Sequence, residues 1–158
     1  MLLTTMLGLA VYLGTETVEA PAAWHRDYVQ AHAETCSSDK PLFIVICSGS
    51  SDYARMVALG TFLSDSVDRT LQADYVRFMI DTDTPAGKEL AGRFDVEEGP
   101  YFVILDRSGK WQVYYQSGYL LDSNLTPVLA RYRRSKLSAT GRPIIEVSQR
   151  QTVRLCST

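Results

Sequence analysis

The chain has 158 residues, of which 46% are hydrophobic and 22% are charged, and its formal net charge is −2. These proportions are typical of a globular protein and exclude an intrinsically disordered chain, and the length fits one domain with a sizeable core. The sequence contains no recognised nucleic-acid-binding motif, so we expect no nucleic-acid partner.

The N-terminal segment, 1–22, begins with an apolar stretch over 1–13. This stretch is too short to span a bilayer, so we expect no transmembrane segment there. Its length fits the apolar region of a signal peptide and Ala20-Pro21-Ala22 supplies small residues for cleavage, although no Lys or Arg precedes it and two glutamates follow it. We interpret 1–22 as the signal peptide of an exported protein, periplasmic or secreted. The alternative is a cytoplasmic protein in which 9–13 form a first strand.

Patterns typical of helices and of strands alternate over 23–135, which we take as the folded domain. Apolar residues at helical spacing predict helices over 22–36, 51–66, 85–94 and 127–136. Apolar and β-branched runs predict strands over 42–47, 74–80, 101–105 and 111–116. The first of these strands is apolar throughout, so we expect it to be buried on both faces. The order predicts an α/β fold with a central mixed sheet flanked by helices, one of which precedes the central strand.

Polar residues and glycines mark the connections between these elements. Ser48–Ser51 form the turn after the first strand, and Ser50 or Ser51 is expected to cap the helix that follows. The segment 106–109 reads as a hairpin turn between the last two strands. Thr126 is expected to cap the last helix, with Pro127 at its first helical position.

Short motifs in this order resemble those of the thioredoxin-like superfamily over 24–132. Lys40-Pro41 stands before the buried strand, and Arg55-Met56 matches the basic-then-apolar pair that follows the second cysteine of the family. Gly99-Pro100 resembles the loop that carries the cis-proline of the family, and Gly118 matches the glycine before its last helix. The resemblance implies a thioredoxin-like fold.

The resemblance places Ser51 and Ala54 at the two positions where the family carries its redox-active cysteines. The motifs on either side of these positions, Lys40-Pro41 and Arg55-Met56, give the same alignment to the family without a gap. It also places Val45 where many members of the family bury an aspartate. Because a serine hydroxyl cannot form a disulfide and an alanine cannot resolve one, we expect no catalytic residues, no disulfide reductase activity and no cofactor.

In the family, the proline loop and the neighbouring helix present a groove to extended peptides, so the resemblance implies that such a groove is retained here. We therefore expect a protein or an extended peptide as partner, with a purely structural module as the alternative. The oligomeric state is left open. The residues of this candidate groove are Ser51, Asp52, Tyr53, Gly99, Pro100 and Tyr101.

The three cysteines, Cys36, Cys47 and Cys156, form no disulfide framework and have no zinc-finger spacing. One disulfide bond that uses Cys156 is an open alternative, but we favour the interpretation that all three thiols are unpaired. Cys47 ends the buried strand and is expected to be an inert core thiol. The alternative is a single-cysteine redox enzyme or thiol sensor that uses Cys47. His25 and His32 are expected on the surface, and no metal site is expected.

The C-terminal segment, 136–158, is interpreted as a basic tail. From Arg131 onward the chain carries seven Lys/Arg and one Glu, whereas the preceding part carries nine basic and seventeen acidic residues. A basic tail can bind an anionic partner or fold back on the acidic body, and both alternatives stay open.

Overall fold

The computed structural model describes residues 24–96, 99–134 and 142–143. The interpreted signal peptide, its alternative strand over 9–13 and all of the basic tail except 142–143 lie outside these residues. No helix in the described ranges is long and apolar enough to cross a membrane.

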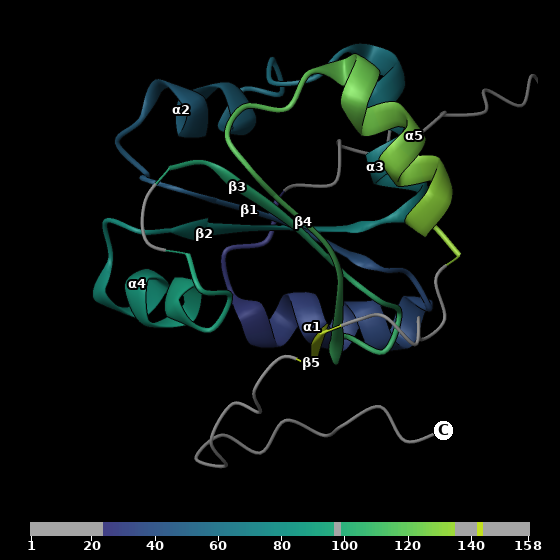
Figure 1. The fold of residues 1–158 in the computed structure, drawn as a ribbon, viewed down its shortest axis with the longest axis horizontal. Helices are drawn as coiled ribbons and strands as arrows, with labels where there is room; N and C mark the ends of the chain where they lie inside the picture. Colours follow the sequence, from purple (N-terminus) through teal and green to yellow (C-terminus); the bar gives the residue numbers. More distant parts are fainter. Residues whose placement is uncertain (1–23, 97–98, 135–141, 144–158) are drawn as a thin grey trace, which may run out of the picture.

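A mixed sheet forms the centre of the described chain, with the strand order β2-β1-β3-β4-β5 (Figure 1). Strand β1 is parallel to β2 and antiparallel to β3, and the β3–β4 and β4–β5 pairs are antiparallel. The predicted mixed sheet is therefore confirmed. The strands are β1 Leu42–Cys47, β2 Val76–Asp81, β3 Tyr101–Leu105, β4 Trp111–Ser117 and β5 Arg142–Pro143.

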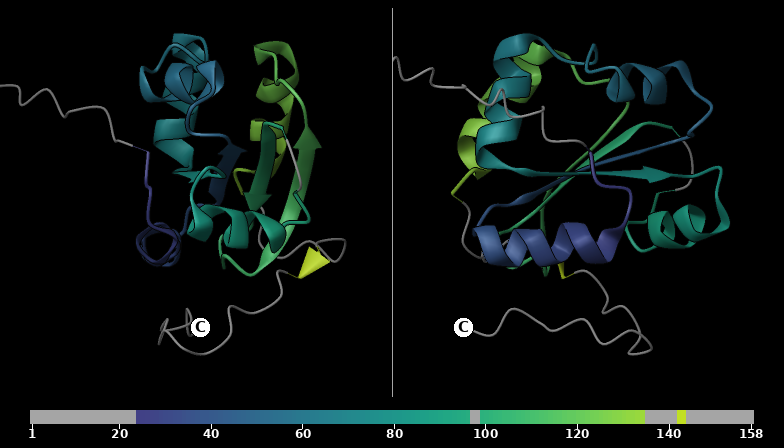
Figure 2. Two further views of the ribbon diagram at one scale, coloured as in Figure 1. Left: turned by 90° about the vertical axis from the view of Figure 1, so that its left-hand side faces the viewer. Right: turned by 180° about the vertical axis from the view of Figure 1, so that it is seen from behind.

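Helices cover both faces of this sheet. Helices α2, α3 and α5 lie on one face, and α1 and α4 lie on the other (Figures 1 and 2). Their bounds are α1 Tyr28–Ser38, α2 Asp52–Ala58, α3 Asp65–Asp74, α4 Pro85–Gly92 and α5 Asp122–Tyr132. This arrangement is the α/β architecture that the sequence predicts.

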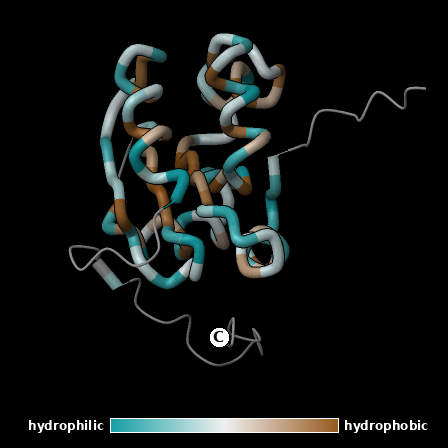
Figure 3. Tube along the Cα trace, turned by 90° about the vertical axis from the view of Figure 1, so that its right-hand side faces the viewer, coloured by the Kyte–Doolittle hydropathy of each residue, from teal (hydrophilic) through white to brown (hydrophobic). Residues whose placement is uncertain are grey.

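Strand β1 supplies both halves of the hydrophobic core. Every one of its residues is at most 2% exposed. Because side chains alternate along a strand, Phe43 and Val45 face α2, α3 and α5, whereas Ile44 faces α1 and α4. Figure 3 shows the hydrophobic segments of the strands in the interior, between the helices.

The first helix begins later than its periodicity predicts. Trp24 lies outside the helix, and His25 pairs with Phe78 as a short parallel addition to the edge of β2. The helix starts only after Asp27, whose side chain accepts a hydrogen bond from the backbone N–H of Gln30. An N-cap residue has extended backbone angles, so the helix cannot continue back through Trp24.

The predicted helix over 51–66 is two helices in the structure. Helix α2 ends at Ala58, and Gly60 then adopts a φ of 69°, a left-handed conformation that ends a helix. Leu59 is consequently 70% exposed instead of lying on an apolar helix face. Helix α3 begins a separate turn at Asp65.

The last helix also differs, because it begins at Asp122 and contains Pro127 inside it. The predicted N-cap at Thr126 is therefore wrong. The Asp122 carboxylate accepts a hydrogen bond from the backbone N–H of Ser64, which ties the first turn of the helix to the loop before α3. Leu125 and Leu129, four residues apart, bury one face of the helix.

His32 is buried, at 5% exposure, and not on the surface as its sequence context predicts. Its ring lies against Gly109 in the hairpin turn, which has a φ of 67°. Burial lowers the pKa of this histidine, so it is neutral at neutral pH.

The Gly109 contact predicts a graded effect of alanine substitution. A Cβ at Gly109 would lie 2.6 Å from the His32 ring, whereas a Cβ at Gly60 would meet nothing within 4 Å. Gly60→Ala introduces only the strain of a left-handed backbone, so it is expected to lower the free energy of unfolding by about 1 kcal/mol. Gly109→Ala also forces the new Cβ against the His32 ring, so it is expected to lower the free energy of unfolding by about 1–3 kcal/mol more. Urea unfolding measures both. Equal losses would contradict the close packing of His32 on the turn.

Candidate functional site

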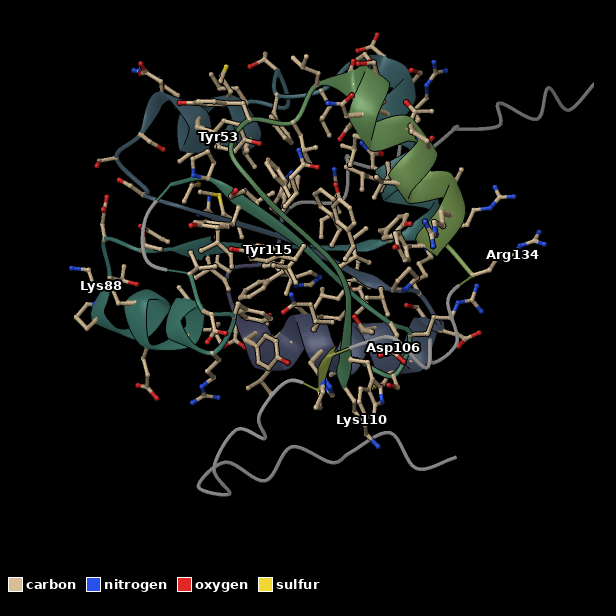
Figure 4. All side chains as sticks on the ribbon, viewed as in Figure 1. Tyr53, Lys88, Asp106, Lys110, Tyr115 and Arg134 are labelled. Atoms are coloured by element: carbon tan, nitrogen blue, oxygen red, sulfur yellow. The ribbon has the colours of Figure 1, made fainter. Side chains whose placement is uncertain are left out.

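A pocket of about 680 Å³ lies where the chain leaves β1, between the N-terminus of α2, helix α4 and the loop before β3. It brings together Ser51, Tyr53, Gly99 and Pro100 of the predicted groove, and Cys47 also lines it. The remaining lining residues are Ser48, Thr82, Asp83, Lys88, Ala91, Val96 and Tyr119. Asp52 and Tyr101 of the predicted groove do not line it. Figure 4 shows Tyr53 on α2 and Lys88 on α4, above and below the sheet at the same end of the molecule.

Ser51 is the N-cap of α2, one of the two candidates, Ser50 and Ser51, that the sequence offers. Its hydroxyl oxygen accepts a hydrogen bond from the backbone N–H of Ala54 at 3.1 Å and donates one to the carbonyl oxygen of Ser48 at 2.5 Å. Ala54 lies one turn into the helix and is 4% exposed. The hydroxyl of Ser51 is therefore used by the fold, and the methyl of Ala54 belongs to the core.

Two aspartates at the end of β2 hold the turn before this helix. The Asp81 carboxylate accepts from the backbone N–H of Gly49 at 2.7 Å, and the Asp83 carboxylate accepts from the backbone N–H of Ser50 and the hydroxyl of Ser48, both at 2.9 Å. The hydrogen bonds from Ser50 and Ser48 lower the pKa of Asp83. Sequence reasoning missed this role.

The acidic residues of this site are hydrogen-bonded to the turn before α2. No group of three or more potential metal-ligating side chains occurs in the described residues. Asp81 and Asp83 instead accept hydrogen bonds from the serine-rich turn, and Asp81 also accepts from the backbone N–H of Asp83 at 2.9 Å. Their carboxylates act as structural acceptors of the loop.

Cys47 is a free thiol at 2% exposure. Burial raises the pKa of this thiol to about 11, against an opposing effect of a hydrogen bond to Ser51. The predicted burial of Cys47 in the core is thus confirmed. Cys36 is disulfide-bonded, so the favoured interpretation of unpaired thiols is wrong for this residue. Cys156 lies outside the described residues.

The peptide bond before Pro100 is trans, because no cis peptide bond occurs in the described residues, and the expected cis-proline is therefore wrong. Gly99 has a φ of 109°, a conformation open to glycine, and this turns the chain into β3 with a trans bond. The carbonyl oxygen of Pro100 accepts a hydrogen bond from Gly118 at 2.9 Å. Within the described part of the chain, no hydrogen bond uses the backbone of Gly99.

An aromatic wall closes the pocket on the side of α2. The ring of Tyr53 contacts the rings of Phe62, Phe102 and Tyr119, with centroids 4.8, 5.9 and 5.6 Å away. Tyr53 is 4% exposed, whereas Tyr119 is 71% exposed. Tyr53 and Tyr119 thus extend the aromatic wall from the core to the surface.

Substitution of Gly49 is expected to break the aspartate contacts of the turn. A Cβ at Gly49 would lie 2.1 Å from a carboxylate oxygen of Asp81, so the carboxylate must move and lose its hydrogen bond to the turn. We expect Gly49→Ala to lower the free energy of unfolding by about 1–3 kcal/mol. Gly92→Ala is the matched control, because a Cβ there meets nothing within 4 Å and the residue is helical. It is expected to raise the free energy of unfolding by about 0.4–1 kcal/mol. An unchanged midpoint of denaturation for Gly49→Ala would contradict this reading of the turn.

The raised pKa of Cys47 predicts slow alkylation of the native protein. With a pKa of about 11, only about 0.1% of the thiol is ionised at pH 8. We expect iodoacetamide to modify Cys47 at least about 100-fold more slowly in the native protein than in urea, with the native rate rising as pH approaches 11. Mass spectrometry of the peptide that contains Cys47 measures both rates. Rapid modification of native Cys47 at neutral pH would contradict this prediction and support the alternative of a single-cysteine redox enzyme or thiol sensor.

Comparison with known proteins finds similarity in structure. No protein-family model matches the chain. No curated protein matches it either. The structure is similar to that of a thioredoxin from Thermus thermophilus, with 25% identity and a TM-score of 0.60 over 71% of this chain and 87% of that one.

Two other similar structures are less alike in sequence. A putative disulphide-isomerase from Bacteroides thetaiotaomicron is 18% identical, with a TM-score of 0.54 over 70% of this chain and 93% of its own. The C-terminal domain of Neisseria meningitidis DsbD is 11% identical, with a TM-score of 0.52 over 70% of this chain and 99% of its own. The chain therefore has the thioredoxin-like fold, as a variant without the CxxC cysteine pair.

Proposed function

We propose that this protein is a thioredoxin-fold domain without disulfide-exchange activity, and that it binds an extended segment of a partner protein. The observation that carries this proposal is that Ser51 and Gly99-Pro100 line one and the same pocket. The pocket lies where thioredoxin-fold enzymes carry their cysteine pair, and the residues at those two positions here, Ser51 and Ala54, have side chains that cannot exchange a disulfide.

The chemistry of the site argues against redox activity. Disulfide exchange requires an accessible thiolate and a second thiol that resolves the mixed disulfide. The hydroxyl of Ser51 is held in the helix cap, and Ala54 has no reactive group. Cys47 is buried and its pKa is raised, so it supplies no thiolate at neutral pH. These observations also count against the single-cysteine alternative.

The surface of the site supports binding of an extended segment. Because the backbone N–H and C=O of Gly99 form no hydrogen bond within the described residues, they are available for strand-like pairing. Tyr119 lines the pocket at 71% exposure, and Leu121, two residues further on, is 65% exposed. A partner that covered these two side chains would remove their apolar surface from water.

A cysteine graft tests the proposed loss of exchange chemistry. The wild-type protein is expected to reduce insulin with dithiothreitol at the background rate. The double variant Ser51→Cys and Ala54→Cys is expected to form a disulfide across the first turn of α2 and to gain activity well above background. Activity of the wild type that disappears in Cys47→Ser would overturn the proposal.

Peptide binding is tested with an immobilised library of N-acetylated, C-amidated random hexapeptides. We expect the wild type to retain a subset of peptides and Tyr119→Ala to bind them about tenfold more weakly. Tyr115→Ala is the matched control, because this tyrosine is 43% exposed but does not line the pocket. Equal binding by the two variants, or no binding by the wild type, would contradict the proposal.

Export stays a proposal of its own, because 1–22 lie outside the described residues. Intact mass of the protein from its native source would show the loss of residues 1–22 if they are a signal peptide. A mass that includes these residues would favour the alternative of a cytoplasmic protein.

A further inference from the structure

A disulfide bond joins Cys36 to a second cysteine. Cys36 is a half-buried residue of α1, and its sulfur lies 4.0 Å from the carbonyl oxygen of Ser108 and 3.8 Å from Nδ1 of His32. Ser108 belongs to the hairpin turn between β3 and β4, and the ring of His32 lies against Gly109 of the same turn. The sulfur of Cys36 is therefore placed beside this hairpin.

The partner of Cys36 follows from the cysteine content of the chain. The chain has three cysteines. Cys47 is a free thiol, buried at the end of β1. Cys156, in the basic tail, is the cysteine that remains. The sequence leaves a bond to Cys156 open, and the bonded state of Cys36 now favours it.

Strand β5 directs the chain towards the same hairpin. It runs antiparallel to β4 and ends with Pro143 opposite Trp111, the first residue of β4. A strand that runs antiparallel to β4 and reaches its start is heading for the hairpin turn, which is the part of the molecule beside Cys36. Figures 1 and 4 show β5, α1 and the hairpin residues Asp106 and Lys110 on the same, lower side of the molecule.

The length of the basic tail allows a bond to Cys36. Ser108 is three residues before Trp111, so the path from Pro143 to the sulfur of Cys36 is about 20 Å. Residues 144–156 follow β5, and an extended chain of about 13 residues spans some 40 Å. The tail is therefore long enough for Cys156 to reach Cys36.

We propose that Cys36 and Cys156 form a disulfide bond that fastens the basic tail beside the hairpin between β3 and β4. Each thiol loses one proton and one electron when the sulfur–sulfur bond forms. The two protons and two electrons reduce a disulfide oxidant, such as oxidised glutathione, to two thiols. An oxidising compartment, where export would place the protein, preserves such a bond. This inference does not depend on peptide binding in the pocket.

The bond has a role at the edge of the sheet. Among the described residues, the pairing of β5 with β4 covers only Trp111 and Gln112. One of the two residues of β5, Pro143, has no backbone N–H to donate, so the hydrogen bonds of this pair are few. An edge strand that loses its cover can pair with another chain. A covalent bond beyond β5 holds the cover in place.

Peptide mapping tests the pairing directly. The full chain is oxidised with glutathione disulfide, unfolded in urea with N-ethylmaleimide, and digested with trypsin and chymotrypsin, which cut between Cys36 and Cys47. We expect the reagent on Cys47 alone, and the peptide of Cys36 linked to that of Cys156 until dithiothreitol separates them. Intact mass distinguishes a bond within the chain from one between copies. Reagent on all three cysteines, or a link from Cys36 to Cys47, to glutathione or to a second copy, would overturn the proposal.

Thermal unfolding measures what the bond contributes. A disulfide restricts the unfolded chain, and more so when it closes a long loop, so we expect Cys156→Ser to lower the Tm by about 5–15 °C. The double variant with Cys36→Ser is expected to lose no more than Cys36→Ser alone, since both lack the same bond. Dithiothreitol is expected to lower the Tm of the wild type to that of Cys156→Ser and to leave this variant unchanged.

Cys47→Ser is the matched control, because it removes a cysteine that is free in the structure. It is expected to keep both the linked peptide and the response of the Tm to dithiothreitol. A linked peptide without any effect of dithiothreitol on the wild-type Tm would show that the bond does not fasten the tail, which also overturns the proposal. These results do not depend on peptide binding, so the proposed function is tested separately.

Discussion

Strand β1 is the element on which the rest of the structure depends. It is hydrogen-bonded to β2 on one edge and to β3 on the other, and both of its faces are buried. An apolar strand of this kind leaves no polar backbone group without a partner, and it fixes the distance between the two helical layers. Its last residue, Cys47, pairs with Asp81, which places the end of β2 beside the turn into α2. The position of the pocket follows from this pairing.

The site combines the architecture of a redox centre with ordinary structural chemistry. At the head of α2, the hydroxyl of Ser51 completes a helix cap, a contribution to stability of about 1 kcal/mol. Ala54 completes the hydrophobic layer below the helix. Each residue thus has a full structural role where an enzyme of this fold would carry a thiol. At these two positions the fold is completed by a helix cap and a core methyl group.

The sequence predicts the sheet well and the helix boundaries less well, for physical reasons. The predicted bounds of β1 and β3 agree with the structure, because continuous apolar runs fix strands that are buried. Periodicity alone could not show that Trp24 leaves the first helix, since the parallel pairing of His25 with Phe78 depends on β2, far along the chain. The burial of His32 likewise depends on a hairpin that is distant in sequence.

The same distinction applies to the site. The cap at Ser51 could be predicted because capping is local. The contacts of Asp81 and Asp83 with the serine-rich turn could not, because they depend on the strand register that sets Cys47 opposite Asp81. The unpaired hydroxyl of Tyr53 could not be predicted either, because a missing hydrogen-bond partner is visible only when all the neighbours of a residue are in place.

The aspartate contacts have a consequence for the thermodynamics of recognition. They tie the turn before α2 to the segment after β2, so one wall of the pocket is preorganised and loses little conformational entropy when a partner binds. The opposite wall ends in Gly99, whose backbone is not tied by any hydrogen bond within the described chain. The pocket therefore has one wall that hydrogen bonds hold in place and another whose backbone hydrogen-bonding groups at Gly99 are not used within the described residues.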